Sequence, residues 1–359
     1  MIDLDAPETF SQADPKGAID RIFGLPGQVQ AAWSLATQLE LPDSHRSARN
    51  VLICGMGGSA IGGDLVRSLV EGAIRVPFGI VRGYDLPAYV NGDTLVILSS
   101  YSGGTEEVLS NCEQAIAAGA RILAVTGGGR LGQIAKERSF PTVSFQFVGQ
   151  PREALGYSAL LIAGVLIKLG YVSDMKMGVE EAIEVMNEMA NELAPGVPSA
   201  DNPAKQLAHR LKGRLPVVYG GGFLTEVARR WKGQFNENAK NWAFYENFPE
   251  LNHNAIAGFR FPTEVRERIT VLMLSCERNH PRIKLREQIT GELLAQAGVA
   301  SEVIEARGAS PIAQMLSLVY LGDLTTYYLA LLNEADPTEI DVLNYLKGRL
   351  ASVPIRDQA

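Results

Sequence analysis

A cluster of hydroxyl-bearing residues follows a short apolar segment in the first third of the chain. Ser100, Ser102 and Thr105 lie within six residues of one another, between the predicted strand Thr94–Leu98 and a predicted helix. In an open α/β sheet this junction faces the ligand crevice, and the first amides of the helix attract anions. We therefore predict that this loop binds a phosphate group without a lysine. The alternative is an ordinary turn in which Thr105 only caps the helix.

A second glycine-rich junction, Gly55–Ala60, follows the predicted strand Val51–Cys54. Its glycines would also let the backbone approach an anion closely. The same residues fit the loose dinucleotide pattern G-x-G-x-x-A, which calls for an acidic residue near the end of the next strand. That strand candidate, Phe78–Val81, is followed by Arg82 and not by an acidic residue. An arginine at this position suits the 2′-phosphate of NADP. An NAD(P)-dependent oxidoreductase that uses the Gly55–Ala60 turn is therefore the alternative function.

Apolar strands alternate with glycine turns and helices along the whole chain. Further strand candidates are Ile122–Thr126, Leu215–Tyr219 and Ile269–Leu274. This alternation is typical of parallel sheets covered by helices on both faces, so we predict an α/β fold.

The length of 359 residues favours two domains. The first is predicted to span residues 1–175 and to contain the phosphate-binding loop. Residues 176–203 would form a helical linker, and residues 204–359 the second domain. The alternative is one large sheet with insertions.

The composition narrows the classes of partner. The formal net charge is −7 and basic runs are absent, which argues against nucleic-acid binding. The three cysteines and four histidines are scattered, so we expect neither a disulfide framework nor a metal. The N-terminus lacks the features of a secretory signal, and the apolar stretch Ala154–Val172 is predicted to be a buried helix, being short for a membrane span. These features predict a cytoplasmic protein that binds no membrane.

Four segments together resemble a known family. The serine-rich loop is similar to the signature of the sugar isomerase (SIS) superfamily. With Gly55–Asp64, Asn236–Lys240 and Glu250–Asn254, the chain resembles the bifunctional phosphoglucose/phosphomannose isomerases from about Asn50 to Leu350. The resemblance implies two SIS domains, a sugar-phosphate substrate, no cofactor, and a homodimer whose subunits share the active sites.

The resemblance also implies roles for individual residues. The substrate phosphate would be held by the backbone amide of Gly58 and by hydroxyls of Ser59, Ser100, Ser102 and Thr105. In the second domain the corresponding loop has become Ser275–Asn279, so phosphate binding is expected in the first domain only.

The residues for the chemical step follow from the same resemblance. Glu237 would be the base, Arg152 the cation near the reacting carbons, His253 the ring-opening group from the partner subunit, and Lys347 the C-terminal lysine. Aldose–ketose isomerisation needs a base to move a proton between C1 and C2, and a cation to stabilise the enediolate. Imidazole suits ring opening near neutral pH.

Simpler roles are the alternatives for these residues. Glu237 and Lys347 would be solvated surface charges, Arg152 a structural ion-pair partner, and His253 a turn residue. Asp64 and Lys240 are expected only to shape turns. A non-catalytic sugar-phosphate sensor is a further alternative, and the presence of both Glu237 and His253 favours the enzyme.

Overall fold

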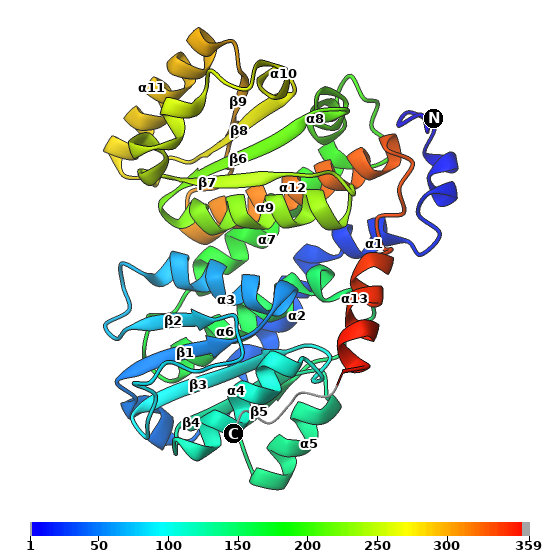
Figure 1. The fold of residues 1–359 in the computed structure, drawn as a ribbon. Coiled ribbons are helices and arrows are strands. Elements are labelled where there is room, and N and C mark those ends of the chain that lie inside the picture. The colour runs from blue at the N-terminus through cyan, green and yellow to red at the C-terminus, as the bar shows by residue number, and fades with distance from the viewer. Residues whose placement is uncertain (1, 354–359) are drawn as a thin grey trace.

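The computed structural model describes residues 2–353 and contains two separate parallel sheets, each in its own lobe of the molecule (Figure 1). The prediction of an α/β fold with two parallel sheets is thus confirmed, and a single large sheet is excluded. The domain boundaries at residues 175 and 204 stay predictions.

The first sheet has five parallel strands in the order β2-β1-β3-β4-β5. The strands are β1 (Asn50–Cys54), β2 (Phe78–Val81), β3 (Thr94–Ser100), β4 (Arg121–Thr126) and β5 (Thr142–Ser144). Because the chain leaves β1 toward β2 and then returns to place β3 on the other side, the strand order reverses between β1 and β3. Ligand sites of open α/β sheets lie at such a reversal, outside the carboxyl ends of the strands.

The second sheet has four parallel strands in the order β7-β6-β8-β9. They are β6 (Leu215–Gly221), β7 (Phe244–Phe248), β8 (Ile269–Ser275) and β9 (Ala300–Glu305). α7 (Lys176–Leu193) occupies the region predicted to be a helical linker. α8 (Pro203–Leu211) begins at the last residue of that region and precedes β6.

The α-helices follow the strands in the expected alternation. The remaining helices are α1 (Ala18–Phe23), α2 (Leu25–Thr37), α3 (Gly57–Val70), α4 (Glu106–Ala117), α5 (Gly129–Arg138), α6 (Leu155–Lys168), α9 (Thr225–Glu237), α10 (Thr263–Arg266), α11 (Pro281–Ala297), α12 (Pro311–Leu332) and α13 (Asp341–Ala351). The described residues also contain the 3-10 helices η1 (Pro7–Gln12), η2 (Asp43–Ser47), η3 (Pro151–Glu153), η4 (Gly222–Leu224), η5 (Glu250–His253) and η6 (Ala255–Gly258). The predicted buried helix near residues 154–172 is α6.

One hydrophobic core joins the two lobes. It contains the side chains of Val51 and Ile53 from the first sheet and of Val218 and Leu272 from the second. α12, which lies behind α9 in Figure 1, contributes buried side chains to this core from Ile312 to Leu332. Sequence reasoning did not single out this helix. Among the described helices it alone is long and apolar enough to cross a membrane, and 94% of that window is buried inside the protein.

The outer faces of the sheets have smaller cores of their own. α4 and α5 cover the first sheet, where Val96 and Leu98 point away from the shared core. Consecutive β3 residues thus alternate between two apolar layers, which explains why every residue of this strand is buried.

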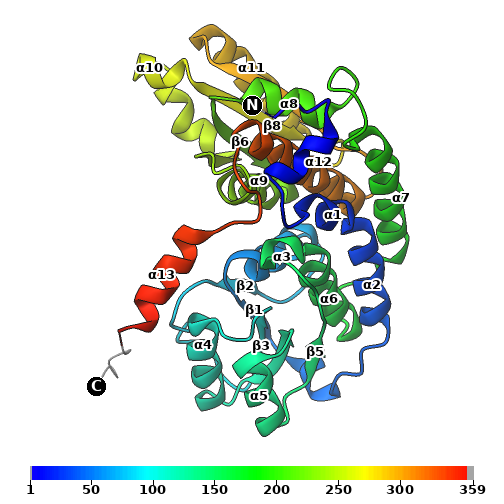
Figure 2. The same ribbon diagram turned by 90° about the vertical axis from the view of Figure 1, so that its right-hand side faces the viewer.

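α13 has no such packing. Figure 2 shows it projecting away from both lobes, and every residue from Asp341 to Leu350 is exposed. The apolar side chains of this helix, Val342, Leu343, Leu346 and Leu350, are therefore uncovered in the single chain.

Candidate active site

The predicted phosphate loop begins at the last residue of β3. Ser100 is buried, and its Oγ lies 2.9 Å from Thr105 Oγ1. Thr105 precedes α4, but its side chain does not cap the helix. Ser102 is exposed, and its Oγ accepts a hydrogen bond from the Gly104 amide. The loop thus curves back on itself and leaves the first amides of α4 without a side-chain cap, as an anion site requires.

The start of α3 stands beside this loop. Ser59 Oγ accepts a hydrogen bond from the Tyr101 amide at 3.2 Å, and Ser99 Oγ donates to Ser59 O. No side chain caps α3, whose first residues are Gly57 and Gly58. The structure therefore brings together Gly58, Ser59, Ser100, Ser102 and Thr105, the predicted phosphate contacts, at the reversal point of the first sheet.

Gly58 also contacts the segment that contains Arg152. A Cβ on Gly58 would lie 2.5 Å from Pro151 O and 2.7 Å from Arg152 N. Only glycine allows this approach, because real Cβ atoms do not come so close to backbone atoms. Arg152, in η3, is thereby fixed next to the Gly57–Ser59 turn at the start of α3.

Arg152 and Glu237 form an ion pair. Arg152 Nη1 lies 3.3 Å from Glu237 Oε2, although the residues are 85 positions apart in the sequence. The arginine side chain is 3% exposed and that of Glu237 is 34% exposed. Burial lowers the pKa of the Arg152 guanidinium, and the negative charge of Glu237 opposes this shift.

Asn238 and Arg230 form hydrogen bonds that fix the side chain and the backbone carbonyl of Arg152. Asn238 Oδ1 accepts a hydrogen bond from Arg152 Nε at 3.0 Å, and Arg230 donates to Arg152 O. Arg230 is itself paired with Asp323 at 2.7 Å. Sequence reasoning missed these supporting residues. Only the position of Asn238 beside Glu237 in the Asn236–Lys240 motif pointed to it.

Glu237 borders two clefts. One, of about 270 Å³, opens between α3 and α9 and is also lined by Gly58 and Arg152. The other, of about 580 Å³, lies toward the start of α13 and includes Lys240 and Trp242. Glu237 thus shares a cleft with Gly58 and Arg152, whereas Ser59 and the Ser100–Thr105 loop do not line it. A base that acts on a bound sugar must be open to such a cleft.

His253 lies away from Glu237 in the single chain. Glu237 ends α9, which runs back along β6, so it lies near the amino ends of the strands. His253 follows β7 and lies at their carboxyl ends. β7 has five residues, so the two side chains are separated by roughly 15 Å or more. His253 is exposed and lines neither cleft.

Lys347 is exposed on α13, and no contact places it at this site. The single chain thus assembles the phosphate loop, Arg152 and Glu237, but neither His253 nor Lys347. Within residues 2–353, no group of three or more His, Cys, Asp or Glu side chains is arranged to hold a metal.

The surroundings of Arg82 and of the second-domain loop bear on the predictions of a 2′-phosphate site and of phosphate binding in the first domain only. Arg82, the candidate for a 2′-phosphate, is paired with the buried carboxylate of Asp64, so its charge is already matched. Asp64 therefore does more than shape a turn. At the reversal point of the second sheet, Asn279 donates to the buried Glu287 at 3.1 Å, an acidic setting that disfavours an anion.

Comparisons with known proteins identify relatives of this chain. Residues 200–350 match the family described as bacterial phospho-glucose isomerase C-terminal SIS domain. A bifunctional phosphoglucose/phosphomannose isomerase from Caldicellulosiruptor bescii is 40% identical over 93% of this chain and 99% of its own length. One from Aquifex aeolicus is 36% identical over 84% of this chain and 90% of its own.

A solved structure shares the fold at lower identity. A hypothetical protein from Thermus thermophilus superposes with a TM-score of 0.73 and 17% identity, covering 97% of this chain and 94% of its own. The extent and identity of the sequence matches establish that the chain belongs to the bifunctional phosphoglucose/phosphomannose isomerase family.

Proposed function

We propose that the protein interconverts fructose 6-phosphate with glucose 6-phosphate, mannose 6-phosphate or both, through an enediolate. The observation that carries the proposal is the ion pair of Arg152 with Glu237, held beside the phosphate loop by the contact of Gly58 with η3. Relatives that bear the name of this activity support it. Neither an oxidoreductase nor a sensor is favoured by these relatives.

Different residues bind the phosphate, transfer the proton and stabilise the developing charge. The hydroxyls of Ser59, Ser100, Ser102 and Thr105 and the amide of Gly58 hold the phosphate. Glu237 removes the proton from C2 of the aldose and returns it to C1. Arg152, fixed by four acceptors, stabilises the oxygen on which negative charge develops. Neither a metal nor an organic cofactor is needed.

We propose that the active form is a homodimer in which His253 of the partner subunit opens the sugar ring. This follows from the opposite ends of the second sheet at which Glu237 and His253 lie, because a single chain cannot bring them to one substrate. A two-fold axis would supply each site with the missing imidazole. Exposed apolar side chains near Glu237 support a partner there, since Trp242 is 73% exposed and Val342 is 82% exposed.

Lys347 is proposed to reach the site only when α13 is packed in this dimer. The proposal includes a cytoplasmic location and no nucleic-acid or membrane partner, in line with the acidic composition.

The direct test is a coupled assay on fructose 6-phosphate that follows glucose 6-phosphate and mannose 6-phosphate separately. Formation of either aldose supports the proposal, and the ratio of the two defines the specificity. Failure of the purified dimer to form either aldose would refute it.

A further inference from the structure

The segment of residues 333–340, here called the strap, connects α12 to α13 and crosses the candidate site. Basic side chains from three distant parts of the chain donate hydrogen bonds to it. Arg152 Nη2 donates to Pro337 O at 2.7 Å and to Thr338 O at 3.3 Å. Lys240 Nζ donates to Asp336 O at 2.6 Å, and Arg21 Nη2 to Thr338 Oγ1 at 3.0 Å.

These contacts use most of the donors of Arg152. A guanidinium has five N–H groups. Nε is used by Asn238 Oδ1, Nη2 by the two strap carbonyls, and one N–H of Nη1 faces Glu237. Within the described residues, the remaining N–H belongs to Nη1, the nitrogen that also faces the proposed base. The orientation of Arg152 therefore decides whether that donor points at the substrate.

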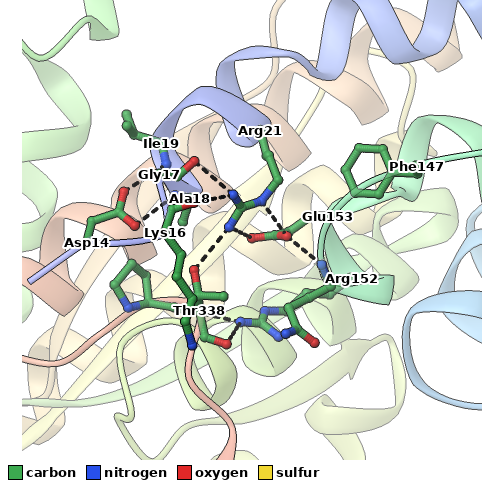
Figure 3. Close-up of polar contacts among 12 residues, drawn as sticks. Asp14, Lys16, Gly17, Ala18, Ile19, Arg21, Phe147, Arg152, Glu153 and Thr338 are labelled. Atoms are coloured by element: carbon green, nitrogen blue, oxygen red, sulfur yellow. Dashed lines mark hydrogen bonds and ion pairs between the residues drawn. The ribbon is translucent and has the colours of Figure 1, made fainter. Parts of the chain in front are cut away.

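Arg21 connects the two segments that set this orientation. Figure 3 places it between Glu153 and Thr338. Its guanidinium pairs bidentately with Glu153, at 2.7 Å through Nε and 3.1 Å through Nη2. Glu153 directly follows Arg152 and also accepts the Gln150 amide at 2.6 Å, which closes the turn of η3. Thr338, on the other side, belongs to the strap.

The Arg21–Glu153 pair is largely buried, and Arg21 is also bonded to the N-terminal segment. The side chain of Glu153 is 5% exposed and that of Arg21 is 19% exposed. Arg21 Nη1 also donates to Lys16 O and Gly17 O, which attaches the N-terminal segment before α1 to the same point. Bidentate arginine–carboxylate pairs fix geometry as well as adding energy, so this pair can hold η3 and the strap in one relative position.

We propose that Arg21 is a positioning residue for the isomerisation, which orients Arg152 through Glu153 and Thr338. The inference rests on the proposed function for its kinetic effect and on the contacts above for its structural one. Arg21 touches no predicted substrate contact, so it acts only through Arg152. Misplacing a catalytic group by about 1 Å can reduce a rate by about 100-fold.

The kinetic test compares Arg21→Met with Arg210→Met. Arg210 is a matched control, because it also pairs bidentately with a carboxylate, Glu302, but far from the site. For Arg21→Met we expect kcat to fall about 100-fold, while KM for fructose 6-phosphate changes by less than about threefold, because the phosphate loop is untouched. Arg210→Met should retain the wild-type kcat. An unchanged kcat in Arg21→Met, below its melting temperature, overturns the proposal.

Thr338 provides variants that keep the fold if Arg21→Met does not. Thr338→Val removes only the hydroxyl that accepts from Arg21, and Thr338→Ser restores it. We expect a smaller loss of kcat in Thr338→Val and recovery in Thr338→Ser. In Arg21→Met combined with Thr338→Val, kcat should equal that of Arg21→Met alone. Additive losses would contradict action through this contact.

A measurement independent of activity separates this inference from the proposed function. The Nε–H proton of Arg152 can be identified by NMR through its loss in Arg152→Lys. Its exchange with solvent should be slow in the wild type and in Arg210→Met, and at least tenfold faster in Arg21→Met. Unchanged exchange refutes the positioning role whether or not the protein is an isomerase, whereas an inactive wild type refutes only the proposed function.

Discussion

Gly58 and Arg152 are in backbone contact, so that a Cβ at position 58 would stand 2.7 Å from the Arg152 amide nitrogen. The contact joins the proposed phosphate-binding turn of α3 to the arginine that faces Glu237. Each backbone is held by a further hydrogen bond, since Ser158 Oγ donates to Gly58 O at 3.3 Å and Arg230 Nη2 donates to Arg152 O at 3.0 Å.

Gly58→Ala should therefore push the start of α3 away from the η3 segment that contains Arg152. We expect kcat/KM to fall about 100-fold, since the added methyl group must displace η3 or the start of α3. Gly27→Ala is the control, because a Cβ at Gly27 in α2 meets nothing within 4 Å. Steady-state kinetics on fructose 6-phosphate checks the result, and equal activity of the two variants would contradict it.

The double variant Ser100→Ala/Thr105→Ala should raise KM with little change in kcat. Two hydroxyl donors to a charged phosphate are lost, each contributing about 1.5 kcal/mol, so KM should rise about 100-fold. Ser34→Ala, which removes an exposed hydroxyl on α2, should not change KM. If KM is unchanged in the double variant, these hydroxyls do not hold the phosphate.

Much of this site was predictable from the sequence, for identifiable reasons. The strand, glycine turn and helix that surround Ser100 are local in sequence, so their composition indicates the fold and suggests the proposed anion site. Arg152 and Glu237 were predicted only by resemblance, because their contact depends on how the two lobes pack.

The supporting residues around the site could not be predicted. The strap carbonyls that hold Arg152 belong to the backbone, which has no sequence signature, and Arg21 is one basic residue of 33. α12 was also missed, since its apolar residues surround the helix and show no one-sided periodicity.

Glu237→Gln should abolish proton transfer while leaving substrate binding nearly intact. Glutamine keeps the shape but not the base, and a positioned base contributes about 10²–10⁴-fold in rate. The measurement is incorporation of solvent deuterium at C2, alongside kcat. Glu264→Gln, with an exposed carboxylate on α10, serves as control. Incorporation at the native rate in Glu237→Gln would exclude Glu237 as the base.

Mixing Glu237→Gln with His253→Ala should restore activity that each variant lacks alone. In a mixed dimer one site has both defects, whereas the other combines an intact Glu237 from one subunit with an intact His253 from the other. Up to half of the sites in such dimers would be active. Native mass spectrometry confirms subunit exchange. If exchange occurs and activity does not return, each chain contains its own complete site.

Lys240 should impose an alkaline limit on activity. The residue is exposed, but its ammonium lies among the carbonyls of Glu237, Asn238 and Asp336. Partial desolvation, and then the charge of Arg152, lower the pKa of Lys240 to about 8, while the nearby carboxylates of Asp336, Glu339 and Glu237 oppose the shift. As pH rises through 8 the ammonium loses a donor to the strap, so kcat should fall.

The same titration affects stability in the opposite direction, because the free energy of unfolding is expected to increase with pH where kcat decreases. The unfolded chain keeps this proton up to about pH 10.5, so between pH 8 and 10.5 the contribution of Lys240 to the free energy of unfolding rises with pH. Lys240→Met should have a lower kcat without this alkaline limb, whereas Lys176→Met, at an exposed site on α7, should keep it. A wild-type kcat that stays constant to pH 9.5 would contradict the role of Lys240.

The core that α12 shares between the lobes limits how this protein can be divided. Val51 of the first sheet and Leu272 of the second belong to the same continuous apolar cluster. A gene fragment that encoded only one sheet would leave one side of this cluster in water, and its product would be prone to aggregate. Although each half has its own parallel sheet, we expect the two to fold stably only as one chain.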